Sequence, residues 1–127
     1  MGYYIRQGAS EFRIRAENLE AARRALLAFL AKGEIGWQRG RAAPDMTAKE
    51  AFACARWDLG LDGAGNAVGI EFLGEKLGDD EAVLRAVAPW VDAGSYVEIL
   101  GEDGHRWRWA FDGTGCREVA AKITWEE

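Results

Sequence analysis

Three runs in which apolar and polar residues alternate occupy the end of the chain, from residue 95 to residue 125. They cover 95–100, 105–111 and 116–125, and two segments rich in Gly and Asp, 101–104 and 112–115, separate them. A strand with one buried face alternates in this way, and Gly and Asp favour tight turns. The pattern predicts a three-stranded antiparallel meander.

The first turn of this meander sets its register. A three-residue loop at 102–104 with Gly104 in the left-handed conformation places Gly101 opposite His105. The resulting pairs are Ile99 with Trp107, Val97 with Trp109, and Glu98 with Arg108. A two-residue loop would mix apolar and charged residues on both faces, so we reject it.

One face of the meander is predicted to be strongly apolar. Its expected members are Trp107, Trp109, Phe111, Ile123 and Trp125. Burying one such side chain is worth roughly 1.5–3 kcal/mol, so the face needs a cover. Apolar residues at helical spacing predict two helices for that purpose, one from an Asn18 cap to Gly33 and one from Asp79 or Asp80 to about Ala88.

The remaining segments complete an α+β pattern. Residues 3–15 predict a hairpin or one strand broken by a turn, 47–54 a short helix with a Thr47–Glu50 capping box, and 57–72 a second hairpin. Residues 33–46 have no period and predict a long loop. We therefore expect one domain over 1–127, with a mainly antiparallel sheet and two main helices on one face. Its β–α–β–β–α–β core would be ferredoxin-like, with the meander added at the C-terminal side.

Composition narrows the class of protein. No apolar run approaches the length of a bilayer span, and the opening residues do not resemble a secretory signal. Two cysteines, Cys54 and Cys116, make neither a disulfide framework nor a metal knuckle, so we expect a reduced, cytoplasmic protein. The net charge of −5 argues against general affinity for nucleic acid.

The charges are unevenly distributed along the chain. Residues 71–103 carry nine acidic residues against Lys76 and Arg85. Such a segment is either a solvated face or a docking surface for a basic or nucleic-acid-binding protein. The candidate partner-binding residues are Glu71, Glu75, Asp79, Asp80, Glu81, Glu102, Asp103 and, in the Gly-rich loop, Trp37. Trp37 is either tucked against the core or an exposed anchor.

Nothing in the sequence predicts catalysis or a cofactor. His105 is the only histidine, which excludes a multi-histidine metal site. Acidic residues at 79–81 are expected at the start of a helix because of the helix dipole. Two alternatives remain: a ligand or active site on the open sheet face, lined by Glu98, Arg106 and Arg108, and single-stranded RNA stacking on Trp107 and Trp109.

Several segments resemble a group of small uncharacterised proteins from phages, prophages and other mobile elements. They read GYYIR at 2–6, GIEFLGEKLGDD at 69–80, GSYVE at 94–98 and GEDGHRWRW at 101–109, and the likeness covers most of the chain outside 33–46. The resemblance implies a ferredoxin-like domain and carries over no catalytic residue. It also implies a host-interaction role, including inhibition of a bacterial defence system such as CRISPR.

The sequence thus predicts a non-enzymatic protein that binds another protein. The expected partner is a basic or nucleic-acid-binding protein, without direct contact to nucleic acid or membrane. The oligomeric state stays an open question, because an exposed ββ unit at the sheet edge could pair with a second copy to form a two-fold homodimer.

Overall fold

The computed structural model describes residues 2–33, 38, 40–122 and 124–126. The chain is α+β. Its helices are α1 (Ala16–Ala31), α2 (Ala48–Cys54) and α3 (Asp80–Val87), and a 3₁₀ turn, η1 (Ala88–Trp90), follows α3. Its strands are β1 (Ile5–Glu11), β2 (Trp57–Leu61), β3 (Ala67–Phe72), β4 (Tyr96–Gly101), β5 (Arg106–Phe111) and β6 (Cys116–Ala120).

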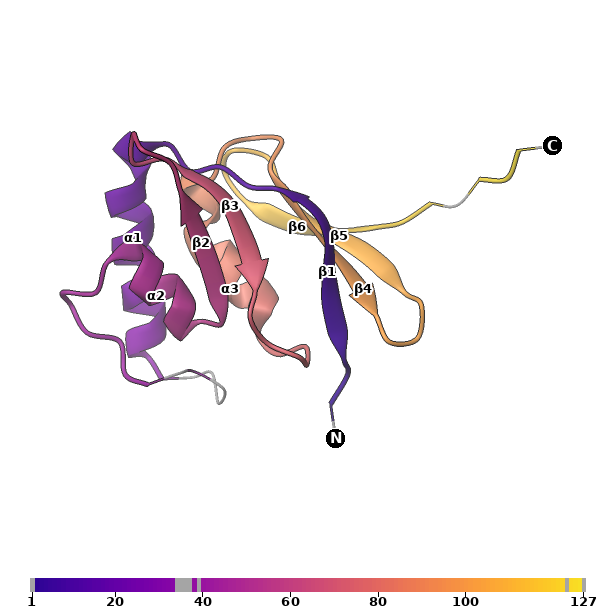
Figure 1. Cartoon of the computed structure of the whole chain (residues 1–127), viewed down its shortest axis with the longest axis horizontal. Helices are drawn as coiled ribbons and strands as arrows, with labels where there is room; N and C mark the ends of the chain where they lie inside the picture. Colours follow the sequence, from indigo (N-terminus) through magenta and orange to yellow (C-terminus); the bar gives the residue numbers. More distant parts are fainter. Residues whose placement is uncertain (1, 34–37, 39, 123, 127) are drawn as a thin grey trace.

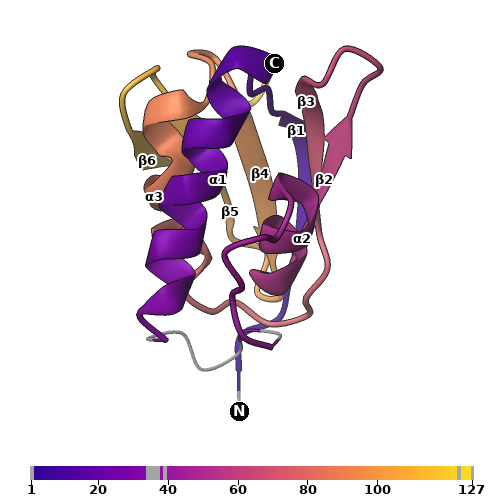
Figure 2. The same ribbon diagram turned by 90° about the vertical axis from the view of Figure 1, so that its left-hand side faces the viewer.

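The strands form two antiparallel sheets. One has four strands in the order β1-β4-β5-β6, and the other is the β2-β3 hairpin. Figures 1 and 2 show α1, α2 and α3 on one side of these strands. A mainly antiparallel sheet with its main helices on one face was predicted, and this coarse architecture is confirmed.

Strand β1 joins the two sheets. On one side it pairs with β4, with Ile5 opposite Gly101 and Glu11 opposite Tyr96. On the other side it meets β3 without a regular ladder. Instead, the Gln7 side chain donates from Nε2 to the Ile70 carbonyl (2.7 Å) and accepts from the Phe72 N–H at Oε1 (2.7 Å). The Gln7 side-chain amide thus takes the place of a pair of backbone hydrogen bonds between β1 and β3.

The core lies between the four-stranded sheet and the helices. Trp107, Trp109 and Phe111 are only 4%, 2% and 3% exposed. Buried residues of α1 and α3 belong to the same core, namely Ala22, Leu26, Leu30, Val83, Leu84 and Val87. The predicted inward orientation of the aromatic face is therefore confirmed for these three side chains of β5.

The predicted register of β4 and β5 is also confirmed. Val97 lies opposite Trp109, Glu98 opposite Arg108, and Ile99 opposite Trp107. Gly104 has φ of 88°, and the Gly101 N–H donates to the His105 carbonyl at 2.7 Å. The turn needs a left-handed residue at 104, and glycine adopts that conformation without steric penalty.

The last strand differs from the prediction. Phe111 pairs with Cys116 across the 112–115 loop, so Val119 lies opposite Arg108 on the face away from the helices. Strand β6 ends at Ala120, and Trp125 is 88% exposed instead of buried. Ile123, also expected in the core, lies outside the described residues.

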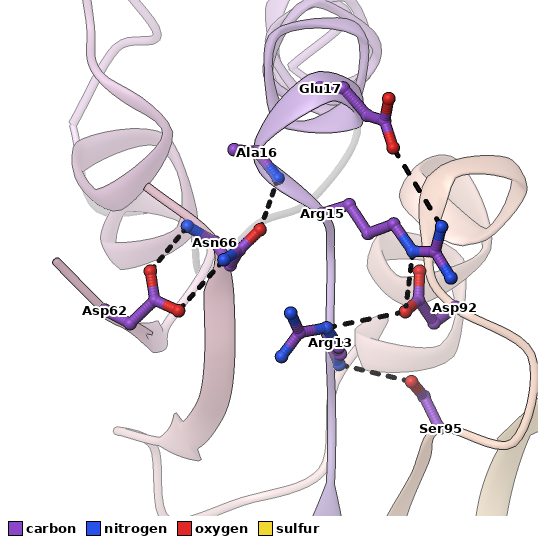
Figure 3. Close-up of polar contacts among 8 residues, drawn as sticks. All are labelled: Arg13, Arg15, Ala16, Glu17, Asp62, Asn66, Asp92 and Ser95. Carbon is purple, nitrogen blue, oxygen red and sulfur yellow. Dashed lines mark hydrogen bonds and ion pairs between the residues drawn. The ribbon is translucent and has the colours of Figure 1, made fainter. Parts of the chain in front are cut away.

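Two alternatives were predicted for the N-terminal segment, and the structure has the single interrupted strand and not the hairpin: residues 5–11 form one strand with a register shift between Gln7 and Ser10. The predicted helix cap is wrong. Asn18 does not cap α1, which begins at Ala16. The Ala16 N–H donates to Oδ1 of Asn66 at 2.8 Å, and the Asn66 amide is itself held by Asp62 (Figure 3). A residue fifty positions along the chain supplies the cap.

The other helix ends agree with the predictions made from the sequence. The Thr47–Glu50 capping box is present at α2, with bonds of 3.1 and 2.9 Å. Helix α3 ends at Val87, as expected from Pro89 two positions later. Gly33 has φ of 66° after the end of α1.

The Gln7 bridge should be measurable as stability. We expect Gln7→Leu to lower the free energy of unfolding by about 2 kcal/mol, because it leaves the Phe72 N–H and the Ile70 carbonyl without these partners. Urea denaturation measures the change. Arg6→Leu is the matched control, since Arg6 is exposed and makes no ion pair with a described residue; it should stay within about 0.5 kcal/mol of the parent. Equal effects of the two changes would contradict a structural role for the amide.

Candidate functional site

The N-terminal residues lie between two acidic loops that are distant in sequence. Ile5 N–H donates to the Glu75 carbonyl at 3.0 Å, and Leu77 N–H donates to the Tyr3 carbonyl at 2.8 Å. On the other side, Glu102 N–H donates to the Tyr4 carbonyl at 2.9 Å. The extended segment 3–5 therefore fastens the 74–78 loop and the 101–104 turn to each other, at the lower end of the molecule in Figure 1.

This arrangement brings together Glu75, Glu102 and Asp103, which we call the acidic end. All three residues are exposed. The Glu102 carboxylate accepts from the Tyr4 N–H at 3.0 Å, and the Asp103 carboxylate accepts from the Tyr3 hydroxyl and from the His105 N–H. These bonds fix two of the three carboxylates, so the negative charge is held in place rather than spread over mobile side chains.

Hydrogen bonding shifts the pKa of both partners in the Tyr3–Asp103 pair. Donation of its hydroxyl to Asp103 raises the pKa of Tyr3 to about 12. The same bond, together with the His105 N–H, lowers the pKa of Asp103 below its usual value. Asp103 is therefore firmly ionised at neutral pH. The Tyr3 ring also stacks on Trp107, with centroids 6.4 Å apart.

Asp80 was predicted to bind a partner, but it is fully buried. Its carboxylate accepts from Arg56 Nη2 at 3.1 Å, from Trp57 Nε1 at 3.3 Å and from the Gly78 N–H at 3.0 Å. Burial raises the pKa of Asp80, and the Gly78 N–H and the Arg56 charge oppose that rise. Asp80 thus holds the start of α3 against the α2–β2 junction and does not belong to a surface.

The remaining predicted residues are scattered. Glu81 is half-buried; it accepts from Trp109 Nε1 at 3.1 Å and pairs with Arg85 at 3.1 Å. Glu71 is exposed on β3, opposite Asp58. Asp79 is exposed at the N-cap of α3 and makes no capping bond with its side chain. Trp37 lies outside the described residues.

The open face of the sheet contains the residues named for a ligand site. Glu98 pairs with Arg108 at 3.2 Å, and the Glu98 side chain is only 14% exposed. The backbone of Gly8 covers it so closely that a Cβ at that position would clash with Glu98 Oε2. A hollow of about 320 Å³ lies beside this pair and is lined by Arg106, Arg108, Val119 and Lys122 among others. Stacking of RNA on Trp107 and Trp109 required exposed indoles, and both are buried.

A second polar cluster secures the opposite end of the molecule. Asp92 pairs with Arg13 at 3.7 Å and with Arg15 at 3.5 Å, and the Arg13 N–H donates to Ser95 Oγ at 3.2 Å (Figure 3). These contacts tie the segment before α1 to the turn before β4. Both arginine side chains are at least half exposed, so we assign the cluster a structural role only.

Metal ligands and reactive thiols were also sought among the described residues. No group of three or more His, Cys, Asp or Glu side chains among them could hold a metal ion. Burial raises the pKa of the Cys116 thiol to about 12 and also raises that of Cys54, so neither is an activated nucleophile. No helix in this part of the chain has the length and apolarity to cross a bilayer.

Comparison of the chain with protein-family models, with curated proteins and with solved structures finds no match.

Substitution of Asp80 should be far more damaging than substitution of its neighbour. We expect Asp80→Ala to lower the free energy of unfolding by about 3 kcal/mol, because it removes the carboxylate from a guanidinium whose side chain is 10% exposed. Asp79→Ala, at an exposed position, should change it by less than about 0.5 kcal/mol. Chemical denaturation of the two variants gives the comparison, and similar losses would show that burial of Asp80 is unimportant.

The Tyr3–Asp103 bond predicts a pH dependence with a definite sign. Its contribution is complete from neutral pH up to the ordinary tyrosine pKa of 10.0 and is lost as the pH rises toward about 12. It is also lost in acid, where Asp103, whose pKa the same bond lowers, becomes protonated. The stability difference between the parent and Tyr3→Phe should therefore be constant from neutral pH to pH 10.0 and shrink above it. Denaturation at a series of pH values tests this. A difference that does not change across that window would contradict the bond.

Proposed function

We propose that the protein is a non-enzymatic binding protein that docks through its acidic end onto a basic surface of another protein. The observation that supports this most is the convergence of Glu75, Glu102 and Asp103 around the N-terminal segment. Their exposure leaves them available for contact, and the hydrogen bonds of Glu102 and Asp103 leave little freedom to be lost on binding.

Fixed negative charge acts mainly on the rate and the selectivity of association. Complementary potentials steer two proteins together and disfavour partners of like charge. A basic partner is therefore favoured, and nucleic-acid-binding proteins are the common class with such surfaces. The net charge of −5 acts in the same direction.

Two finer points belong to the same proposal. If the Gln7 contacts and the Ile14–Ala67 bridge are counted as pairing of β1 with β3, the strand order becomes β2-β3-β1-β4-β5-β6. We propose that this is a ferredoxin-like core extended by a C-terminal meander. Origin in a phage or another mobile element, with inhibition of a host defence system such as CRISPR, rests on the sequence resemblance alone.

Affinity capture with charge-reversed variants tests the docking role. Glu75 belongs to the acidic end, and Asp79 directly follows the 74–78 loop. Glu75→Lys with Asp79→Lys reverses these two exposed charges, whose side chains take part in no structural bond within the described residues. Glu11→Lys with Glu17→Lys changes the net charge equally at the other end of the molecule and is the control. We expect a specific bacterial protein to be captured by the parent and the control, and association with the first variant to be about tenfold slower.

The salt dependence completes the experiment. Capture should weaken between low and moderate ionic strength, because exposed charges are screened over about 10 Å at 0.1 M salt. Recovery of no specific protein at either salt concentration, or equal capture by both double variants, would count against docking through the acidic end.

A further inference from the structure

The face of the four-stranded sheet that points away from the helices carries four arginines. Arg6 lies opposite Leu100, which in turn lies opposite Arg106. Arg108 lies opposite Val119, and Arg117 lies opposite Ala110. Because Trp107 and Trp109 point inward, their neighbours Arg106 and Arg108 point outward. We call Arg6, Arg106, Arg108 and Arg117 the arginine face.

Most of this positive charge is not neutralised by the protein. Arg6, Arg106 and Arg117 are exposed and form no ion pair with any residue that the structure describes. Arg108 is paired with Glu98. By register, Glu98 and Glu11 are the acidic residues on the same face of these strands, so four positive charges meet two negative ones. An acidic protein thus presents a basic sheet surface.

Arg108 is held in an orientation suited to stacking. Its guanidinium carbon lies 4.1 Å from the centroid of the Tyr96 ring, and its side chain is 46% exposed. The guanidinium packs over the Tyr96 ring, and Glu98 accepts from Nε at 3.2 Å. A planar group fixed in this way offers its other side to a nucleobase.

The hollow beside Arg108 can receive an anion. It measures about 320 Å³, and its lining includes the basic side chains Arg106, Arg108 and Lys122. Arg106 and Arg108 are two residues apart on one strand, a distance of about 7 Å along it, and Arg6 lies about 10 Å across the sheet from Arg106. The spacing of these arginines suits a polymer that carries repeated negative charges, and it is too wide for one small ion to contact them all.

We propose that the arginine face binds single-stranded nucleic acid. Phosphates lie against Arg6, Arg106 and Arg117, which can donate in pairs to phosphate oxygens, and a base stacks on Arg108. A single strand fits because its bases are free to stack. An acidic polypeptide could use the same charges but not the guanidinium plane. This surface adjoins the acidic end, since Arg6 and Glu102 line one hollow, but its role does not depend on the docking role proposed above.

Fluorescence anisotropy with a labelled oligothymidylate, and with the corresponding oligouridylate, tests the proposal. We expect binding at low salt that weakens steeply as salt is added. Arg106→Ala with Arg117→Ala should reduce the slope of log affinity against log salt by about 1.4, since each lost phosphate contact on a single strand removes about 0.7. Neither substitution leaves a carboxylate of the described residues unpaired, because Arg106 and Arg117 form no ion pair with one.

A second variant separates charge from stacking. Arg108→Lys keeps the positive charge and loses the planar group over Tyr96. We expect affinity to fall about tenfold, the scale of one stacked base, with the salt slope unchanged. Arg41→Ala removes an exposed arginine from the segment before α2 and should alter neither quantity. Thermal unfolding confirms that each variant is folded.

Three results would overturn the proposal. They are no binding of either oligonucleotide at low salt, equal salt slopes for the parent and the Arg106→Ala/Arg117→Ala variant, and displacement of the oligonucleotide by an equal concentration of polyglutamate. The last result would assign the face to an acidic protein segment instead.

Discussion

The position of β1 is the constraint on which both surfaces depend. This strand is bonded along one edge to β4 and is held on its other edge to β3 by the Gln7 amide and the Ile14–Ala67 bridge. Its first residues fasten the two acidic loops together, and Arg6 follows immediately on the open face. A one-residue slip of β1 would exchange its two faces, bury Arg6 and expose Ile5. The pairing that closes the core therefore also places the charges.

Local patterns predicted much of the fold, because the determinants of those elements are close together in sequence. The turn at 101–104 and the alternation around it were enough to derive the pairing of Glu98 with Arg108. Helical spacing predicted α1 and α3, and Pro89 predicted the end of α3. The inward orientation of Trp107 and Trp109 followed from the same register. In each case a few neighbouring residues fixed the backbone.

Contacts between distant segments were not predictable in this way. Gln7 reaches β3, Asn66 caps α1, and Arg56 meets Asp80, yet no periodic pattern relates the members of these pairs. Acidic residues near a helix start are usually solvated, so nothing distinguished buried Asp80 from exposed Asp79. For the same reason the sequence did not predict which acidic residues gather at one end of the molecule. Glu75 and Glu102 are brought there by backbone bonds on either side of the N-terminal segment.

The net charge of the chain does not describe the charge of each face. The value of −5 is a sum over the chain, but at physiological ionic strength a charge is felt over only about 8 Å. A ligand on the arginine face therefore responds to Arg6, Arg106 and their neighbours rather than to the total. Strand alternation produces this local excess, because every second position of β5 must be apolar to fill the core and the positions between them are free to carry arginine. The tryptophans and the arginines of β5 are thus two consequences of one pleat, because the alternation that buries the first exposes the second.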